Sequence, residues 1–176
     1  MPYRRAMQPV IHLVFGPQGA GKSAYSRELA ERVGGVRLSI DEWMGELFGP
    51  DLTRPLNLAW IMARVQRCEQ RIWVTASAIA GAGGSVVLDL GFMKVASRSA
   101  FRSRAGAAGL SAQLHVVSAP QALRRHRVLT RNTEQGATFS FEVTPTMFDV
   151  MEREFEPPTA EELAVATVIE TGSDPA

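Results

Sequence analysis

Residues 16–23 read Gly16-Pro17-Gln18-Gly19-Ala20-Gly21-Lys22-Ser23, which is the pattern G-x-x-x-x-G-K-S of a phosphate-binding loop, or P-loop. The apolar run over residues 10–15 precedes the loop and predicts a buried strand, and residues 23–33 follow it with the apolar spacing of a helix. Between a strand and a helix, glycines let backbone N–H groups wrap a phosphate, and the helix N-terminus adds a favourable dipole. We therefore predict that the chain binds a nucleoside triphosphate.

The residue types in the P-loop predict separate roles. Lys22 is expected to bridge the β- and γ-phosphates of the nucleotide, and the hydroxyl of Ser23 is expected to ligate Mg²⁺. Residues 16–21 and Ala24 are expected to complete the nucleotide site. The sequence lacks the Asn-Lys-x-Asp tetrad that reads guanine, which favours ATP as the nucleotide.

The composition is that of one globular domain, which we expect to span residues 1–176. Hydrophobic residues make up 45% of the chain and charged residues 21%, values typical of globular proteins. Charged residues or glycines interrupt every apolar run before it reaches the length of a membrane span. The chain shows no signal-peptide pattern, and its single cysteine, Cys68, forms no internal disulfide. We expect a cytoplasmic location, no membrane partner, and a monomer or homodimer.

The net charge of +1 hides an uneven distribution of charge along the chain. Residues 94–131 contain eight basic and no acidic residues, whereas residues 142–162 contain seven acidic residues and one arginine. A basic middle segment suits an anionic ligand, although two solvated helix faces of opposite sign would show the same pattern.

Strand and helix signals alternate along the chain. The expected strands are residues 10–15, 36–40, 86–90, 112–117 and 166–170. The expected helices are residues 23–33, 56–80, 95–108, 120–132 and 144–155. This alternation predicts an α/β protein with the three-layer P-loop NTPase fold, in which a five-stranded parallel sheet carries helices on both faces. Ligands in such sheets bind beyond the carboxyl ends of the strands.

Asp41 follows the second expected strand, which we expect to lie beside the P-loop strand. A carboxylate at this place suits phosphoryl transfer to a hydroxyl, because it can orient the attacking oxygen and accept its proton. The other interpretation is that Asp41 only caps the helix that follows it. Trp43, two residues after Asp41, is a candidate for the wall of a substrate pocket.

Asp89 ends the apolar strand over residues 86–90. An apolar run that ends in a carboxylate resembles a Walker B element, which holds Mg²⁺ through water. Contact with the substrate and a bond to neighbouring backbone are the alternatives for this side chain.

Arg127 and Arg131 are four residues apart, so both side chains leave one face of the expected helix. A polar loop follows at once, and together they predict a short helical lid over about residues 124–143 that closes on the triphosphate. A basic surface helix is the alternative. We expect Arg124 and Arg125 to be solvated, and we assign no metal or catalytic role to the three histidines, His12, His115 and His126.

Several motifs in combination resemble small bacterial ATP-binding proteins that are often labelled AAA-type ATPases. That group is similar to the P-loop kinases that include polynucleotide kinase, chloramphenicol phosphotransferase, zeta toxin and gluconate kinase. Besides the P-loop, the motifs are Ser39-Ile40-Asp41-Glu42-Trp43-Met44, Val87-Leu88-Asp89-Leu90-Gly91-Phe92, Arg127…Arg131-Asn132 and Phe155-Glu156-Pro157-Pro158.

The resemblance implies transfer of phosphate from ATP to a hydroxyl. By similarity, Lys22 and Ser23 hold phosphate and Mg²⁺, and Asp41 is the base. Arg127 and Arg131 are then the lid arginines, and the segment near Thr171 and Gly172 borders the adenine.

The acceptor is the open question. Polynucleotide kinases often carry an arginine three residues after the base aspartate, but this chain has Met44 there, which disfavours a nucleic-acid acceptor. We expect a small molecule, such as an antibiotic, a sugar or a nucleoside, and an antibiotic is attractive because similar small kinases confer resistance. The candidate acceptor contacts are Asp41, Trp43, Arg54, Arg64, Asp89, Arg98 and Arg102.

Two other functions are weighed against this one. A polynucleotide 5′-hydroxyl kinase would use the basic stretch over residues 94–131. A nucleotide-dependent ATPase or switch acting with a protein partner ranks last, because the chain is too short for the additional helical domain of oligomeric AAA motors.

Overall fold

The computed structural model describes residues 8–52, 55, 57–134 and 143–172. The strands are β1 (Val10–Phe15), β2 (Val36–Ser39), β3 (Val86–Asp89), β4 (Ser111–Ser118) and β5 (Thr167–Glu170). They pair in parallel in the order β2-β3-β1-β4-β5. The predicted α/β fold with a five-stranded parallel sheet is therefore confirmed.

The order of the strands corrects one expectation. β2, which leads to Asp41, does not lie beside the P-loop strand β1, because β3 pairs with both of them. All of β3 is buried, whereas β2 exposes 45% of Val36 at its start. The continuous apolar run of β3 thus takes the inner position, and the more polar β2 takes the edge.

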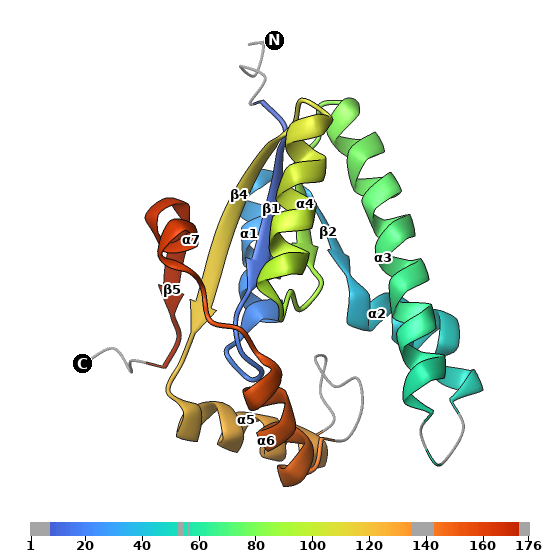
Figure 1. Ribbon diagram of the computed structural model, residues 1–176, viewed down its shortest axis with the longest axis vertical. Coiled ribbons are helices and arrows are strands. Elements are labelled where there is room, and N and C mark those ends of the chain that lie inside the picture. Colours follow the sequence, from blue (N-terminus) through green and yellow to red (C-terminus); the bar gives the residue numbers. More distant parts are fainter. Residues whose placement is uncertain (1–7, 53–54, 56, 135–142, 173–176) are drawn as a thin grey trace.

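Helices cover both faces of the sheet, as predicted. The helices are α1 (Lys22–Val33), α2 (Ile40–Phe48), α3 (Leu58–Gly81), α4 (Val95–Ala107), α5 (Gln121–Glu134), α6 (Pro145–Glu154) and α7 (Ala160–Val165), with a short 3₁₀ helix η1 (Gly49–Asp51). In Figure 1, α4 lies in front of the sheet and α1 behind it. Ile72 of α3 and Phe101 of α4 belong to the larger core cluster on one face, and Leu29 of α1 belongs to the cluster on the other. Within the described ranges, no helix is long and apolar enough to cross a membrane.

α5 and α6 lie beyond the carboxyl ends of the strands, where the P-loop also lies (Figure 1). Val128, Val143 and Phe148 form a small core between them. Asn132 donates to the carbonyl of Val143 at 2.8 Å and accepts from its N–H at 3.0 Å. The lid predicted over about residues 124–143 thus includes most of α5, while residues 135–142 lie outside the described part of the chain.

A chain of hydrogen-bonded rings lies between α1 and the sheet. The hydroxyl of Tyr25 is 2.8 Å from Nδ1 of His115, and Nε2 of His115 is 3.0 Å from Nδ1 of His12. The two histidines are 3% and 5% exposed, respectively. Burial, reinforced by the charges of His12 and Arg32, lowers the pKa of His115 to about 4, and burial also lowers the pKa of His12. Both rings are therefore neutral at neutral pH.

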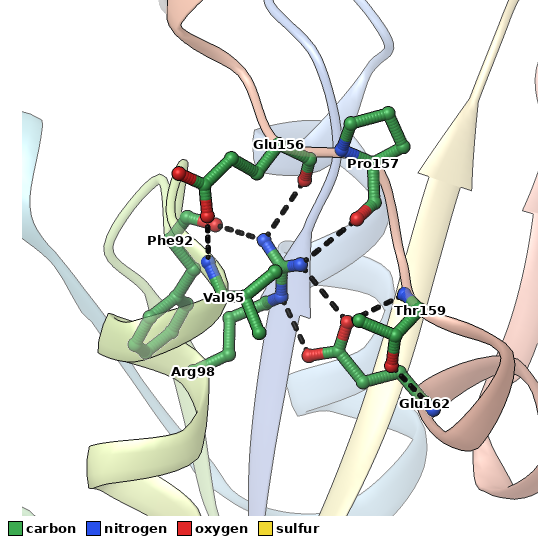
Figure 2. Close-up of polar contacts among 7 residues, drawn as sticks. All are labelled: Phe92, Val95, Arg98, Glu156, Pro157, Thr159 and Glu162. Atoms are coloured by element: carbon green, nitrogen blue, oxygen red, sulfur yellow. Dashed lines mark hydrogen bonds and ion pairs between the residues drawn. The ribbon is translucent and has the colours of Figure 1, made fainter.

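Arg98, expected to contact the acceptor, lies instead in the core. Its side chain is fully buried, and it donates to both carboxylate oxygens of Glu162, from Nε at 2.7 Å and from Nη2 at 2.9 Å. It also donates to the backbone carbonyls of Phe92, Glu156 and Pro157 (Figure 2). These bonds occupy the guanidinium, so the structure does not place Arg98 in the site. Its bond to Phe92, which has a positive φ of 46°, holds the strained turn that follows β3.

We expect Arg98→Ala to lower the free energy of unfolding by about 3–5 kcal/mol, because the carboxylate of Glu162 would remain buried without its partner. Arg102→Ala is the matched control, since Arg102 is an exposed arginine on the same helix. That variant should stay within about 0.5 kcal/mol of the parent. Denaturant titration of the three proteins measures the difference, and equal losses in both variants would contradict the assignment.

We also expect the free energy of unfolding to fall as the pH decreases from about 6.5 toward about 4. His115 has a pKa of about 4 in the folded chain and an ordinary pKa of 6.5. Between these two values its imidazole takes up a proton in the unfolded chain but stays neutral in the folded chain, so a lower pH favours unfolding. Denaturant titrations across the window should show a shallower pH dependence for His115→Gln. The exposed His126, changed in the same way, should leave the parental dependence in place. Equal slopes in the two variants would speak against this account.

Candidate functional site

The P-loop passes so close to its neighbours that two of its positions leave no room for a side chain. A Cβ atom on Gly16 would lie 2.0 Å from the carbonyl oxygen of Val117, and one on Gly19 would lie 2.6 Å from that of Arg124. Gly16 and Gly19 also have φ values of 152° and 78°, which L side chains rarely adopt. Glycine is therefore required at both positions, and the loop is held between β4 and α5.

The P-loop forms one side of a cavity of about 600 Å³ at the carboxyl edge of the sheet. Its other walls come from the start of α2, the turn after β3, and helices α5 and α6. Six residues that we predicted from the sequence to act in catalysis or ligand binding line this cavity: Lys22, Ser23, Asp41, Asp89, Arg127 and Arg131. The fold thus gathers groups that are spread over more than one hundred positions of the chain into one place.

Lys22 opens α1 and donates from Nζ to the carbonyl of Pro17 at 2.9 Å, so the side chain folds back over the loop. Burial lowers the pKa of Lys22, and the carboxylates of Asp89 and Asp41 oppose this effect. Lys22 therefore lies near the loop and two acidic groups, whose charges favour its protonated form.

Asp41 lies in the first turn of α2, but it is not the cap of that helix. The cap is Ser39, whose hydroxyl accepts from the backbone N–H of Glu42 at 3.4 Å. The carboxyl of Asp41 faces the cavity and keeps access to solvent there. The surrounding protein atoms and then the charge of Asp89 raise its pKa, while nearby cations, Lys22 first among them, oppose the rise. A carboxylate with a raised pKa is a suitable proton acceptor near neutral pH.

Asp89 is bound by an arginine that the sequence analysis missed. Arg37 donates to Oδ2 of Asp89 from Nη2 at 2.8 Å and from Nε at 3.3 Å, and Asp89 is only 5% exposed. The one signal in the sequence is the alternation of β2, which puts Arg37 and Ser39 on the same face of the sheet. That pattern does not reveal which carboxylate the arginine meets.

The two lid arginines stand in different environments. Nη1 of Arg127 donates to the hydroxyl of Thr171 at 2.9 Å, and that hydroxyl donates to the carbonyl of Ala20 in the P-loop at 2.7 Å. Nε of Arg131 is buried without a hydrogen-bond partner among the described residues. Such an unpaired cationic donor beside a P-loop is what an anionic ligand would satisfy.

Arg124 corrects a further expectation, because it is not solvated. It is 6% exposed and donates to the carbonyls of Ala119 at 2.9 Å and Gln18 at 3.2 Å, and it pairs with Glu152 of α6. Its neighbour Arg125 does keep 40% of its side chain exposed. Arg124 therefore joins α5 to the P-loop.

The remaining predicted contacts that fall on described residues do not line the cavity. Trp43 packs against the larger core, and Arg64 stacks on Trp60 with its guanidinium carbon 3.4 Å from the ring centroid. Arg102 is exposed on α4, and Arg54 lies outside the described residues. Thr171 contacts the P-loop, as described above, and Gly172 follows it beside Leu123 of α5.

Comparison with protein families gives one match across most of the chain. A family model described as an AAA domain (AAA_33) matches residues 11–158. No curated protein matches the chain.

Solved structures share the fold at low sequence identity. A candidate kinase from Chloroflexus aurantiacus J-10-fl is 18% identical, with a TM-score of 0.74 over 95% of this chain and 90% of the other. A gluconokinase from Sinorhizobium meliloti 1021 is 16% identical, with a TM-score of 0.58 over 95% and 85%. The APS kinase of Mycobacterium tuberculosis, solved with AMPPNP and APS, is 15% identical, with a TM-score of 0.63 over 95% and 91%.

Proposed function

We propose that this chain, which belongs to the AAA domain family (AAA_33), is an ATP-dependent kinase that transfers the γ-phosphate of Mg·ATP to a hydroxyl of a small molecule. The observation that carries the proposal is the convergence of Lys22, Asp41 and Arg131 on one cavity beside the P-loop. Phosphoryl transfer requires positioning and charge stabilisation more than covalent chemistry, and these groups supply both.

The residues present fit ATP. The close approach of backbone at Gly16 and Gly19 leaves room for a phosphate chain but not for side chains. The Nε of Arg131, buried without a partner among the described residues, supplies a donor from α5 to the same cavity. Structural neighbours that are called kinases support this reading, and one of them was solved with an ATP analogue. Thr171 and Gly172 then stand near the base of the nucleotide, at the end of β5.

The residues present also fit Mg²⁺, which usually binds through few protein oxygens together with water and phosphate oxygens. Ser23 would hold it through its hydroxyl, and the bound ion would neutralise phosphate charge. Asp89 is the acidic side chain that was also considered for Mg²⁺, but Arg37 already binds its Oδ2. We therefore place Asp89 beside the acceptor.

In the proposed reaction, Asp41 orients the acceptor hydroxyl and accepts its proton as the acceptor oxygen forms a bond to the γ-phosphorus. The bond between that phosphorus and the β–γ bridging oxygen breaks, and ADP carries away the electron pair. Lys22 and Arg131 stabilise the charge that moves to the leaving oxygen, and Arg127 holds the lid against the P-loop through Thr171.

The wall of the cavity away from the P-loop suits an acceptor with an apolar face. It contains Ile40, Leu90, Met93 and Met151 together with the carboxylates of Asp41 and Asp89. An antibiotic, a sugar and a nucleoside all belong in the acceptor panel. A nucleic-acid acceptor ranks lower, because Met44 packs against the core at the position where an arginine would read a nucleic-acid phosphate.

We expect Asp41→Asn to reduce phosphotransfer roughly 10²-fold or more while leaving ATP binding nearly unchanged, because the amide can orient a hydroxyl but cannot accept its proton. Lys22→Ala should abolish transfer through loss of phosphate stabilisation. Calorimetric titration with Mg·ATP measures binding, and labelled ATP with a panel of hydroxylated antibiotics, sugars and nucleosides measures transfer.

The matched control is Asp51→Asn, the same change at an exposed aspartate in η1. It should transfer phosphate at the parental rate. Parental turnover by Asp41→Asn would rule out the base assignment, and the absence of any heat with nucleoside triphosphates would rule out the proposed function itself.

A further inference from the structure

Arg37 joins three elements of the fold around Asp41. From β2, its guanidinium donates to Asp89 at the end of β3 at 2.8 Å and 3.3 Å, and to Glu42 in the first turn of α2 at 2.6 Å. Glu42 follows Asp41 directly in the sequence. The side chains of Arg37 and Asp89 are only 10% and 6% exposed, so their contact is largely shielded from solvent, whereas Glu42 keeps 48% of its side chain exposed.

The register of the sheet explains how one side chain reaches both partners. Arg37 pairs with Val87 and Ser39 pairs with Asp89, so Arg37 and Asp89 share a face and are one side-chain repeat apart. The planar fork of an arginine can bind a carboxylate on each side of itself, which the single ammonium group of a lysine cannot do with the same geometry.

We propose that Arg37 is a positioning residue of the phosphotransfer site, which ties Asp89 to the first turn of α2 and so fixes both cavity carboxylates around the reacting hydroxyl. This role rests on the proposed function, because its catalytic consequence is the placement of Asp41. Arg37 itself does not line the cavity and touches no reacting atom.

If Arg37 acts through its charge as well as its packing, the pKa of Asp41 depends on it. Among the described residues, the charged groups that act most strongly on Asp41 come from four elements: Lys22 of α1, Asp89 of β3, Arg131 of α5 and Arg37 of β2. Asp89 raises the pKa of Asp41, and Arg37 lowers it. Without Arg37, the Asp41 carboxylate would lose a cation and would face an Asp89 charge that is no longer balanced. Asp41 would then ionise only at higher pH.

The test is Arg37→Gln, with Arg27→Gln as the matched control. Arg27 of α1 also contacts Glu42, at 3.4 Å, so this control removes an arginine from the same carboxylate and leaves the pair of Arg37 and Asp89 in place. Carbon-13 NMR follows the titration of the Asp41 carboxyl, whose signal is assigned by its loss in Asp41→Asn. We expect the titration midpoint of Asp41 to move to higher pH in Arg37→Gln and to stay at the parental value in Arg27→Gln.

Kinetics provide the second measurement. Arg37→Gln should lower kcat at neutral pH by about 10-fold to 100-fold, the range for residues that orient the groups of a site without contacting the substrate. The loss should shrink as the pH rises, and the KM for ATP should stay unchanged. A loss that is equal at every pH, or that falls on the KM for ATP, would overturn the proposal.

Arg37→Lys guards against failure to fold, because it retains the positive charge. Its Asp41 midpoint should lie closer to the parent than that of Arg37→Gln, with kcat still reduced because the two-sided fork is lost. An Asp41 midpoint that is the same in the parent and in folded Arg37→Gln, a parental kcat in Arg37→Lys, or a midpoint that moves as far in Arg27→Gln would overturn the proposal. The NMR result does not depend on finding an acceptor, so failure of the kinase assay alone would count against the proposed function instead.

Discussion

The closeness of the P-loop to the backbone around it is the constraint on which the site depends. Gly16 meets the carbonyl of Val117 on β4, and Gly19 meets that of Arg124 on α5, at distances that exclude any side chain. The loop is thereby fixed to the sheet on one side and to the lid helix on the other. Arg124 strengthens the second attachment through its bond to Gln18. Because the loop and the lid share this junction, the groups on α1 and α5 keep a defined relation to each other.

A second constraint is the balance of charge in the cavity. Asp41 and Asp89 would repel each other strongly if they stood alone at the edge of the core. Lys22 on one side and Arg37 on the other offset this repulsion, and Arg131 adds a cation from the lid. The acidic and basic side chains of this network come from separate elements. Such a network holds its dipoles in place before a ligand arrives, which is the arrangement that favours stabilisation of shifting charge.

Much of this architecture is predictable from the sequence. The P-loop, the run of strands and helices and the meeting of Asp41 with Asp89 at one edge follow from local pattern and from the geometry of parallel sheets. Whether an individual arginine is buried or exposed does not follow from these patterns. Arg98 and Arg102 lie on the same helix, yet one is buried and the other exposed, because Glu162, the partner of Arg98, comes from a segment 64 residues away.

The strand order and the role of Arg37 cannot be predicted from local sequence, for a similar reason. Local sequence shows which face of β2 carries Arg37, but the carboxylate it meets is decided by β3 pairing between β2 and β1. The sequence analysis considered only Asp41 as the cap of α2, but the structure shows that Ser39, also a favourable residue type, takes that place.

The two bonds between Asn132 and the backbone of Val143 have a consequence for the length of the chain between them. They join Asn132 to Val143, so the chain between these residues is a closed ring whose two ends stay together whatever sequence lies between them. Lengthening such a ring costs little, because closure entropy grows only with the logarithm of its length. Insertions and deletions between Asn132 and Val143 would therefore cost little folding free energy as long as these two residues keep their bonds.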